Sequence, residues 1–376
     1  MTAFTRGAAL LAAVCLSSTA LAACSQPSNS STPVASGSSP AAGSSGAGSA
    51  AAGSAAAGSS GGSSSGFKTM KAGDIVVGYA GPTLTNAFFV GLDKGIKDGV
   101  KAEGFQLTET NANGDASQQF NDAMNLLNRG VNVLVLTPID SNGITPVVQA
   151  ANAKHVPVFT LDRGASGGTI TCFVETNNKK AGEEAANLIA AQMKARYGKA
   201  QGNVVDLVGL VGTTAATDRE TGFQTGLKEN PGLKVVAKQE GGFDQEKSLN
   251  VMSNILQANP QIDAVFGAND DNTVGAEKAI DSANRFQPPG SKNHIYIVGL
   301  DGTAQALQAI RDGKQDATIS QNPIKMAEQS MSYIKDLMVD GKTVPAHAFW
   351  PSQLITKANI DSAQVKTYGI WSAEVK

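Results

Sequence analysis

Short apolar strand patterns alternate with helix patterns along residues 74–339, and this alternation constrains the fold more than any other feature. We predict strands at 74–80, 105–109, 131–137, 156–161, 169–174, 203–210, 233–239, 262–267, 294–300 and 316–320. We predict helices at 86–103, 116–129, 141–154, 178–197, 217–229, 244–258, 271–282, 303–312 and 323–339. Alternation at this spacing is typical of parallel sheets with crossover helices. The pattern restarts after Asn177, so we expect two similar α/β lobes.

Polar side chains follow several of the predicted strands. They are Thr137, Asp162, Arg163, Asn269, Asp301 and Gln321. In open α/β sheets, ligands bind outside the carboxyl ends of the strands. Carboxylate, amide, hydroxyl and guanidinium groups all suit sugar hydroxyls. The sequence therefore predicts a cleft that binds a small polyhydroxylated molecule.

The N-terminus has the pattern of a secretory signal at residues 1–23, with Arg6 followed by a mostly apolar run. This run ends in Leu-Ala-Ala before Cys24 and resembles the lipobox of bacterial lipoproteins. The resemblance implies that Cys24 becomes the mature N-terminus and carries acyl chains that anchor the protein to the membrane. An ordinary cleaved signal is the alternative. Either way we expect an extracytoplasmic location, in a periplasm or on a cell surface.

Residues 25–66 are almost wholly Ser, Gly and Ala and contain no Lys, Arg, Asp or Glu. Such a stretch cannot bury enough apolar surface to fold. We expect residues 24–66 to be a disordered tether between the lipidated cysteine and the folded part.

Composition excludes several classes of function for residues 67–376. Arg6 is the only charged residue before position 67, which leaves 29 basic and 32 acidic residues in the folded part. This balance does not suit nucleic-acid binding. Its three histidines lie far apart in the sequence, so we expect no metal and no other cofactor. After signal cleavage and lipidation, only Cys172 remains, and we expect it to be a buried apolar residue.

Seven short motifs resemble the ribose-binding protein family of bacterial sugar ABC transporters, and the resemblance covers residues 74–357. The motifs lie at 83–89, 160–163, 212–219, 243–244, 268–270, 299–302 and 320–321. The resemblance implies two Rossmann-like lobes with parallel sheets, joined by a three-stranded hinge near 176–177, 321–322 and 352–354. It implies an N-terminal lobe of 67–176 plus 322–352, a C-terminal lobe of 177–321 plus 353–376, and a monomer.

The same resemblance implies a set of sugar contacts. They are Asn86, Phe88, Phe89, Asp162, Arg163, Arg219, Phe243, Asn269, Asp301 and Gln321. Aromatic rings can pack against the C–H faces of a sugar, carboxylates accept from hydroxyls and guanidinium groups donate to them. Thr137 completes the candidate set, although the family usually has Asn there. Ala87 replaces a usual proline, so the preferred sugar is open.

We expect the substrate-binding component of a sugar ABC importer, whose lobes close on ribose, another pentose, a small hexose or a polyol. A permease with a separate ATPase subunit would be the partner, because the chain lacks a Gly-x-x-x-x-Gly-Lys-Ser/Thr loop. The alternative is a receptor that presents its closed form to a chemoreceptor or sensor kinase. A lac-repressor-type regulator is disfavoured because no helix-turn-helix precedes the lobes. An enzyme is disfavoured because two arginines should keep Asp162 and Asp301 ionised.

Overall fold

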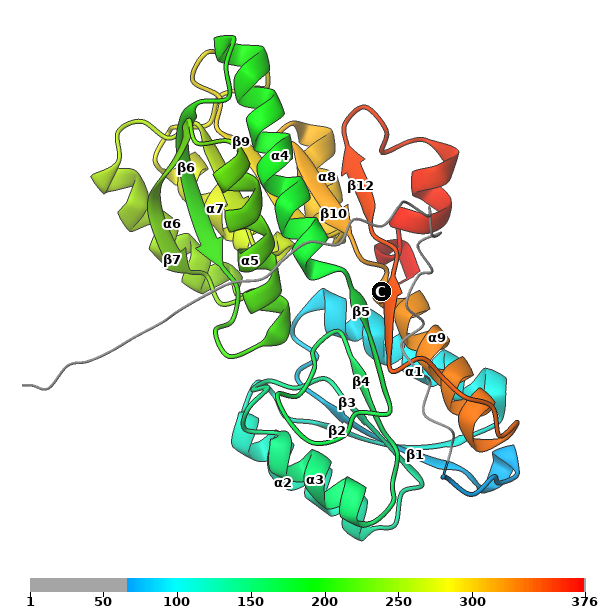
Figure 1. Ribbon diagram of the computed structural model, residues 1–376. Helices are drawn as coiled ribbons and strands as arrows, with labels where there is room; N and C mark the ends of the chain where they lie inside the picture. Colours follow the sequence, from blue (N-terminus) through cyan, green and yellow to red (C-terminus); the bar gives the residue numbers. More distant parts are fainter. Residues whose placement is uncertain (1–65, 375–376) are drawn as a thin grey trace, which may run out of the picture. The chain divides into compact units, whose positions relative to one another are not determined.

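The computed structural model describes residues 66–374, which form two α/β lobes, each built on a six-stranded sheet (Figure 1). The fold class predicted from the sequence is confirmed. The predicted signal peptide, Cys24 and residues 24–65 of the predicted tether lie outside the described residues. Within 66–374, no helix combines the length and the apolar character that a membrane span requires.

The first sheet has the strand order β11-β5-β4-β3-β1-β2, and its strand pairs are parallel. Its strands are β1 (Val76–Gly81), β2 (Gln106–Asn111), β3 (Val133–Leu136), β4 (Val158–Leu161), β5 (Cys172–Thr176) and β11 (His347–Trp350). Its helices are α1 (Ala87–Glu103), α2 (Ala116–Asn128), α3 (Thr145–Ala153) and α9 (Pro323–Met338).

The second sheet repeats this arrangement in the order β12-β10-β9-β8-β6-β7, with β12 antiparallel to β10. Its strands are β6 (Gly202–Val208), β7 (Leu233–Glu240), β8 (Ala264–Gly267), β9 (Tyr296–Asp301), β10 (Ala317–Ser320) and β12 (Gln353–Thr356). Its helices are α4 (Asn178–Tyr197), α5 (Thr214–Glu229), α6 (Gln245–Ala258), α7 (Asp270–Ser282) and α8 (Ala304–Asp312).

Both sheets place their first five strands in the order 2-1-3-4-5. This order has a switch point between the first and third strands, where connections leave in opposite directions and open a crevice at the carboxyl ends. The inner strands β3, β4, β8 and β10 are buried along their whole length. This burial explains why they read as unbroken apolar runs in the sequence.

Helices cover both faces of each sheet. In the first lobe, α1 and α9 share one apolar core with the sheet, and α2 and α3 share another on the opposite face (Figure 1). In the second lobe, α4 and α5 pack on one face and α6 and α7 on the other. Helices α4 and α5 cross closely at Gly182: a Cβ there would lie 2.0 Å from the Arg219 carbonyl oxygen. A glycine at this position therefore allows α5, which carries Arg219, to pack directly against α4.

Within residues 66–374, three connections join elements of the two lobes: from β5 to α4, from β10 to α9, and from β11 to β12. After β12, Trp371 packs into the core that α1 and α9 share. The three connections are short and lie at 177, 321–322 and 351–352. Short parallel connections of this kind permit two lobes to rotate as rigid bodies about a common hinge.

Some boundaries differ from the sequence-based expectation. The helix expected at 141–154 begins at Thr145, because the Asp140 carboxylate accepts from the N–H groups of Asn142 and Gly143 and holds a turn. The strand expected at 169–174 is β5, which begins only at Cys172. That cysteine is fully buried, and burial raises its pKa to about 12, which confirms an apolar packing role.

Candidate functional site

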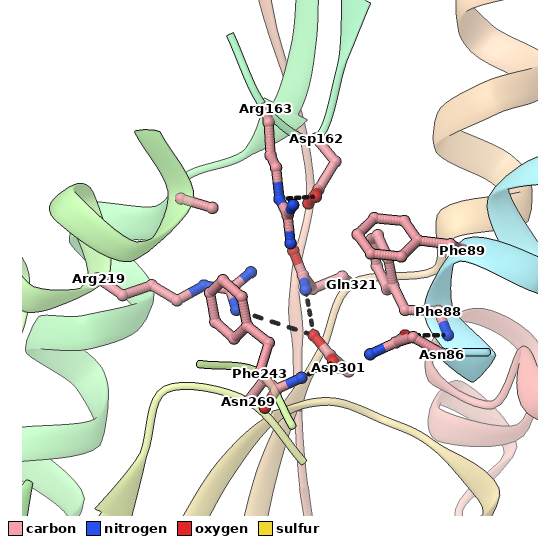
Figure 2. A pocket seen from close by; sticks show the side chains of 11 residues that line it. Asn86, Phe88, Phe89, Asp162, Arg163, Arg219, Phe243, Asn269, Asp301 and Gln321 are labelled. Atoms are coloured by element: carbon pink, nitrogen blue, oxygen red, sulfur yellow. Dashed lines mark hydrogen bonds and ion pairs between the residues drawn. The ribbon is translucent and has the colours of Figure 1, made fainter. Parts of the chain in front are cut away.

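A pocket lies at the carboxyl ends of the strands and is lined from both lobes (Figure 2). The empty space at this pocket, including its open mouth, is about 250 Å³. The lining residues are Asn86, Phe88, Phe89, Asp162, Arg163, Ala215, Arg219, Phe243, Asn269, Asp301 and Gln321. The structure thus brings together every predicted binding residue in its folded part except Thr137.

The connection from β1 to α1 supplies one apolar wall of the pocket. Asn86 caps α1, and its Oδ1 accepts a hydrogen bond from the N–H of Phe88 at 2.8 Å. Phe88 and Phe89 follow in the first helical turn, with ring centroids 5.5 Å apart in an edge-to-face arrangement. The cap therefore fixes where both rings stand.

Asp162 and Arg163 directly follow β4. Asp162 has a φ of 61°, which is strained for a residue with a side chain, and its N–H donates to the Val174 carbonyl at 2.9 Å. The guanidinium of Arg163 lies 4.8 Å from the ring centroid of Phe89 and 5.3 Å from that of Phe243. Arg163 therefore contacts one aromatic ring from each lobe, Phe89 from the first and Phe243 from the second.

Arg219 extends from α5 and is held by two hydrogen bonds. Its Nε donates to Asn178 Oδ1 at 2.7 Å, and its Nη1 donates to the Ala268 carbonyl at 2.8 Å. Its guanidinium lies 5.4 Å from the Phe243 ring centroid. The far edge of that ring occupies the space where Gly209 lacks a side chain. Neither hydrogen bond uses Nη2, the other terminal nitrogen of Arg219.

Asp301 lies at the centre of the second-lobe side of the pocket (Figure 2). Its carboxylate accepts from Asn269 Nδ2 at 3.2 Å and from Gln321 Nε2. Arg219 Nη1 lies 4.0 Å from Asp301 Oδ1. The indole N–H of Trp371 donates to the Asp301 carbonyl at 2.8 Å and fixes the backbone at this point.

Burial dominates the electrostatics of the two carboxyl groups. It raises the pKa of Asp162, and the positive charges of Arg163 and Arg219 oppose it only in part. Burial likewise raises the pKa of Asp301 well above its usual range, again against Arg219. The arginines therefore do not bring the pKa of either group below its usual range, because desolvation outweighs the nearby charges.

Three buried polar atoms of pocket residues have no hydrogen-bond partner among the described residues. They are Asp162 Oδ1, Arg163 Nε and Gln321 Oε1. A buried polar atom without a partner costs about 1–3 kcal/mol. Ligand groups that both donate and accept, as hydroxyls do, can satisfy these two acceptors and one donor.

Hydrogen bonds also join the two lobes around the pocket. They are Asn86 Nδ2 to Asp271 Oδ2, the Ser141 N–H to the Gly212 carbonyl at 3.1 Å, and the Gly164 N–H to the Thr214 hydroxyl at 2.9 Å. The described lobes are therefore in contact at the pocket rim, and the pocket lies between them.

Thr137 does not line the pocket, contrary to the prediction. It is fully buried after β3, and its carbonyl accepts from Gln119 Nε2 at 2.8 Å. The same side-chain amide accepts from the Ile139 N–H and donates to the Ala80 carbonyl. Gln119 therefore holds the segment after β3 against α2, and Thr137 lies beside Tyr79 instead of at the pocket surface.

Several residues of the site were not predicted. Ala215 lines the pocket within the 212–219 motif, where its small side chain leaves room beside Arg219. Asp271 and Trp371 support the lining without belonging to it. The sequence signal for the last of these is the large apolar ring of Trp371 near the C-terminus.

A family model described as a periplasmic binding protein domain matches residues 77–343 of the chain. The ribose import binding protein of Bacillus subtilis is 36% identical over 284 residues, which cover 76% of this chain and 88% of that protein.

Solved structures agree with the architecture. A Mycobacterium smegmatis protein in complex with β-D-fucofuranose aligns with a TM-score of 0.72 and 28% identity, covering 80% of this chain and 97% of that one. A carbohydrate transporter solute-binding protein from Agrobacterium radiobacter in complex with D-arabinose aligns with a TM-score of 0.71 and 26% identity, covering 78% and 98%.

Proposed function

The chain belongs to the periplasmic binding protein domain family, and we propose that it is the substrate-binding component of a sugar ABC importer. It captures ribose, another pentose, a small hexose or a polyol between its lobes and delivers it to a permease that works with a separate ATPase subunit. The family places it outside the cytoplasm. Relatives named for ribose import, together with solved structures that hold β-D-fucofuranose and D-arabinose, support this substrate class.

The observation that carries the proposal is the chemistry of the pocket lining. Phe88, Phe89 and Phe243 give apolar walls for the C–H faces of a sugar ring. The lining also contains two carboxyl groups, two guanidinium groups and three side-chain amides. This mixture matches a molecule whose edge is all hydroxyl and whose faces are apolar, and it matches an amino acid or an ion less well.

Ligand capture proceeds by closure of the lobes about the three connections. Asp162 and Arg163 come from the first lobe, and Arg219 and Asp301 come from the second. A sugar that bridges the two sets binds the closed state better than an open one, and this difference drives closure. The permease then binds the closed form and receives the sugar.

We assign the lobes as 67–176 plus 322–352 and 177–321 plus 353–376, and we assign the protein as a lipid-anchored monomer. The sequence supports a signal peptide at 1–23, acylation at Cys24 and a tether at 24–66. Mass spectrometry of the membrane-extracted protein is expected to find an acylated N-terminal Cys24. A protein that is secreted without acyl chains would contradict this anchor.

A thermal-shift screen tests the substrate class. The chain beginning at Ser25 is heated with D-ribose, other pentoses, hexoses and polyols. A ligand at 100 times its Kd stabilises the folded state by about 2.7 kcal/mol, which raises the melting temperature visibly. Stabilisation by one or a few of these sugars is expected. If none of them changes the melting temperature, the proposal is wrong.

Substitution in the pocket tests the site itself. Asp162→Asn removes a charged acceptor, whose hydrogen bond contributes about 1.5–3 kcal/mol, so the Kd should rise roughly 10- to 150-fold. The matched control is Asp312→Asn, at an exposed position in α8. Equal affinity in the Asp162 variant and the control would remove Asp162 from the binding set.

A further inference from the structure

A buried glutamate outside the pocket connects the hinge to Arg219. Glu175 is 3% exposed, and its Oε2 accepts from Asn178 Nδ2 at 2.9 Å. Its Oε1 lies 2.9 Å from His347 Nε2. Asn178 is buried in turn, and its Oδ1 accepts from Arg219 Nε. A continuous chain of hydrogen bonds therefore runs from His347 to a guanidinium that lines the pocket.

Donor and acceptor chemistry fixes the direction of this chain. The Nε of Arg219 can only donate, so the oxygen of the Asn178 amide must face it. The nitrogen of that amide then faces Glu175 and needs an acceptor there. Since Arg219 Nη1 is held by the Ala268 carbonyl, the orientation of the guanidinium depends on Asn178 and on this carbonyl.

The chain of hydrogen bonds also crosses the hinge. Glu175 and His347 lie on β5 and β11, neighbouring strands of the first sheet. Asn178 is the first residue of α4, and Arg219 lies in α5, both in the second lobe. The bond between Glu175 and Asn178 thus spans the connection at 177, and β11 leads into the connection at 351–352. Rotation about these connections changes the geometry of this bond.

The charge on Glu175 depends on its surroundings. Burial raises its pKa to about 8; Asn178 and Arg219 lower it, whereas Asp218 and Asp162 raise it. Asp218 lies on α5, where it pairs with Lys179 of α4 at 3.6 Å. Burial lowers the pKa of the His347 imidazole, which bonds to Glu175 from β11.

We propose that Glu175 and Asn178 are positioning residues for Arg219, and that with His347 they form a proton-sensitive link through which the hinge tunes sugar affinity. This inference rests on the proposed function of the pocket. When Glu175 ionises, its bond to the Asn178 amide becomes charge-assisted and roughly twice as strong. Arg219 is then held more firmly, so affinity rises with pH.

The test combines a spectroscopic readout with a binding profile. In the ligand-free chain from Ser25, the Arg219 Nε–H signal is followed by NMR from pH 6 to 9, after assignment by its loss in Arg219→Lys. A shift with a midpoint near 8 is expected, and Glu175→Gln should remove it. The Kd for D-ribose, or for the pentose giving the largest thermal shift if D-ribose gives none, is measured over the same range by calorimetry.

The expected profile in the unsubstituted protein is a three- to tenfold gain in affinity from pH 7 to 9. This gain should be smaller in Glu175→Gln and in His347→Phe, which keeps the stacking on Phe173. Glu184→Gln, at a partly buried acid on α4, is the matched control and should keep the full gain.

Each negative result has a distinct meaning. An Arg219 signal that does not titrate, or a binding profile that is unchanged by both Glu175→Gln and His347→Phe, overturns the inference. An absence of binding by every sugar in the screen contradicts the proposed function instead, and the NMR titration still decides whether the link exists.

Discussion

Replacing Gly209 with alanine should damage the pocket without damaging the fold. A Cβ at this position would lie 2.2 Å from Cζ and 2.4 Å from Cε1 of Phe243, whereas ordinary contacts lie at 3.4–4 Å. The ring must therefore withdraw by about 1.2 Å or more. Because the obstructing atoms are the far end of a side chain, the backbone can stay in place.

The displaced ring has only unfavourable places to go. Phe243 has a φ of 60° and lies between the guanidinium groups of Arg163 and Arg219, 5.3 and 5.4 Å from its centroid. Withdrawal from Gly209 moves the ring toward the pocket and disrupts one or both of these contacts. Full burial of a phenylalanine side chain contributes about 1.5–3 kcal/mol. A ligand that loses this contact should bind roughly 10- to 150-fold more weakly.

Calorimetry with D-ribose, or with the sugar that gives the largest thermal shift, measures the change in Kd. Thermal unfolding measures the change in stability. A double-mutant cycle sharpens the result: in the Phe243→Ala background, Gly209→Ala should have almost no further effect, since the ring it displaces is absent. Gly73→Ala is the control, because a Cβ there meets no atom within 4 Å. Equal penalties in both backgrounds, or a large loss of stability, would refute the steric argument.

Further predictions concern helix packing and a buried acid. Gly182→Ala places a Cβ 2.0 Å from the Arg219 backbone and should destabilise the fold by about 1–3 kcal/mol or more while weakening sugar binding. Gly99→Ala in α1 places a Cβ 2.7 Å from Met331 Cγ and 3.4 Å from the nearest backbone atom, the Cα of Glu328. Because the close contact is with a side chain and not with backbone, chemical denaturation should find a smaller loss than for Gly182→Ala, and calorimetry should find unchanged binding. Burial raises the pKa of Glu277 to about 8, so its stability contribution is complete below about pH 4.5 and is lost as pH rises through 8. Glu277→Gln should therefore be more stable than the parent at pH 9, by an upper bound on the order of 5 kcal/mol, and equal to it near pH 4. Urea unfolding that gave the same difference at both pH values would contradict this.

Most strands and helices of both lobes could be predicted because each has a local sequence pattern that marks it. Buried parallel strands such as β3 and β8 are apolar along their length, and helix ends are marked by caps such as Asn86 and Asp244. The edge strands β11 and β12 gave no such signal. They are short, only partly buried and separated by Pro351, so no hydrophobic period distinguishes them from a loop.

The lining of the pocket could be predicted because polar residues at strand ends converge at one edge of a sheet. Thr137 shows the limit of this rule. It stands at the same kind of position as Asp162, yet the amide of Gln119 draws its segment toward α2. That hydrogen bond joins residues 18 positions apart, so the sequence around Thr137 alone does not predict it. Strand ends indicate where a ligand site lies, and long-range hydrogen bonds decide which residues reach it.

The raised pKa values of the pocket carboxyl groups connect affinity to closure. In the closed arrangement, Asp162 and Asp301 are desolvated, and Asp162 Oδ1 has no partner among the described residues. Closure without ligand therefore carries an unfavourable term that the arginines do not cancel. In the proposed complex, sugar hydroxyls donate to these carboxylates and remove this term only when both lobes are in place. Ligand binding is thereby favoured in the closed state specifically, which is the differential affinity that a closing receptor requires.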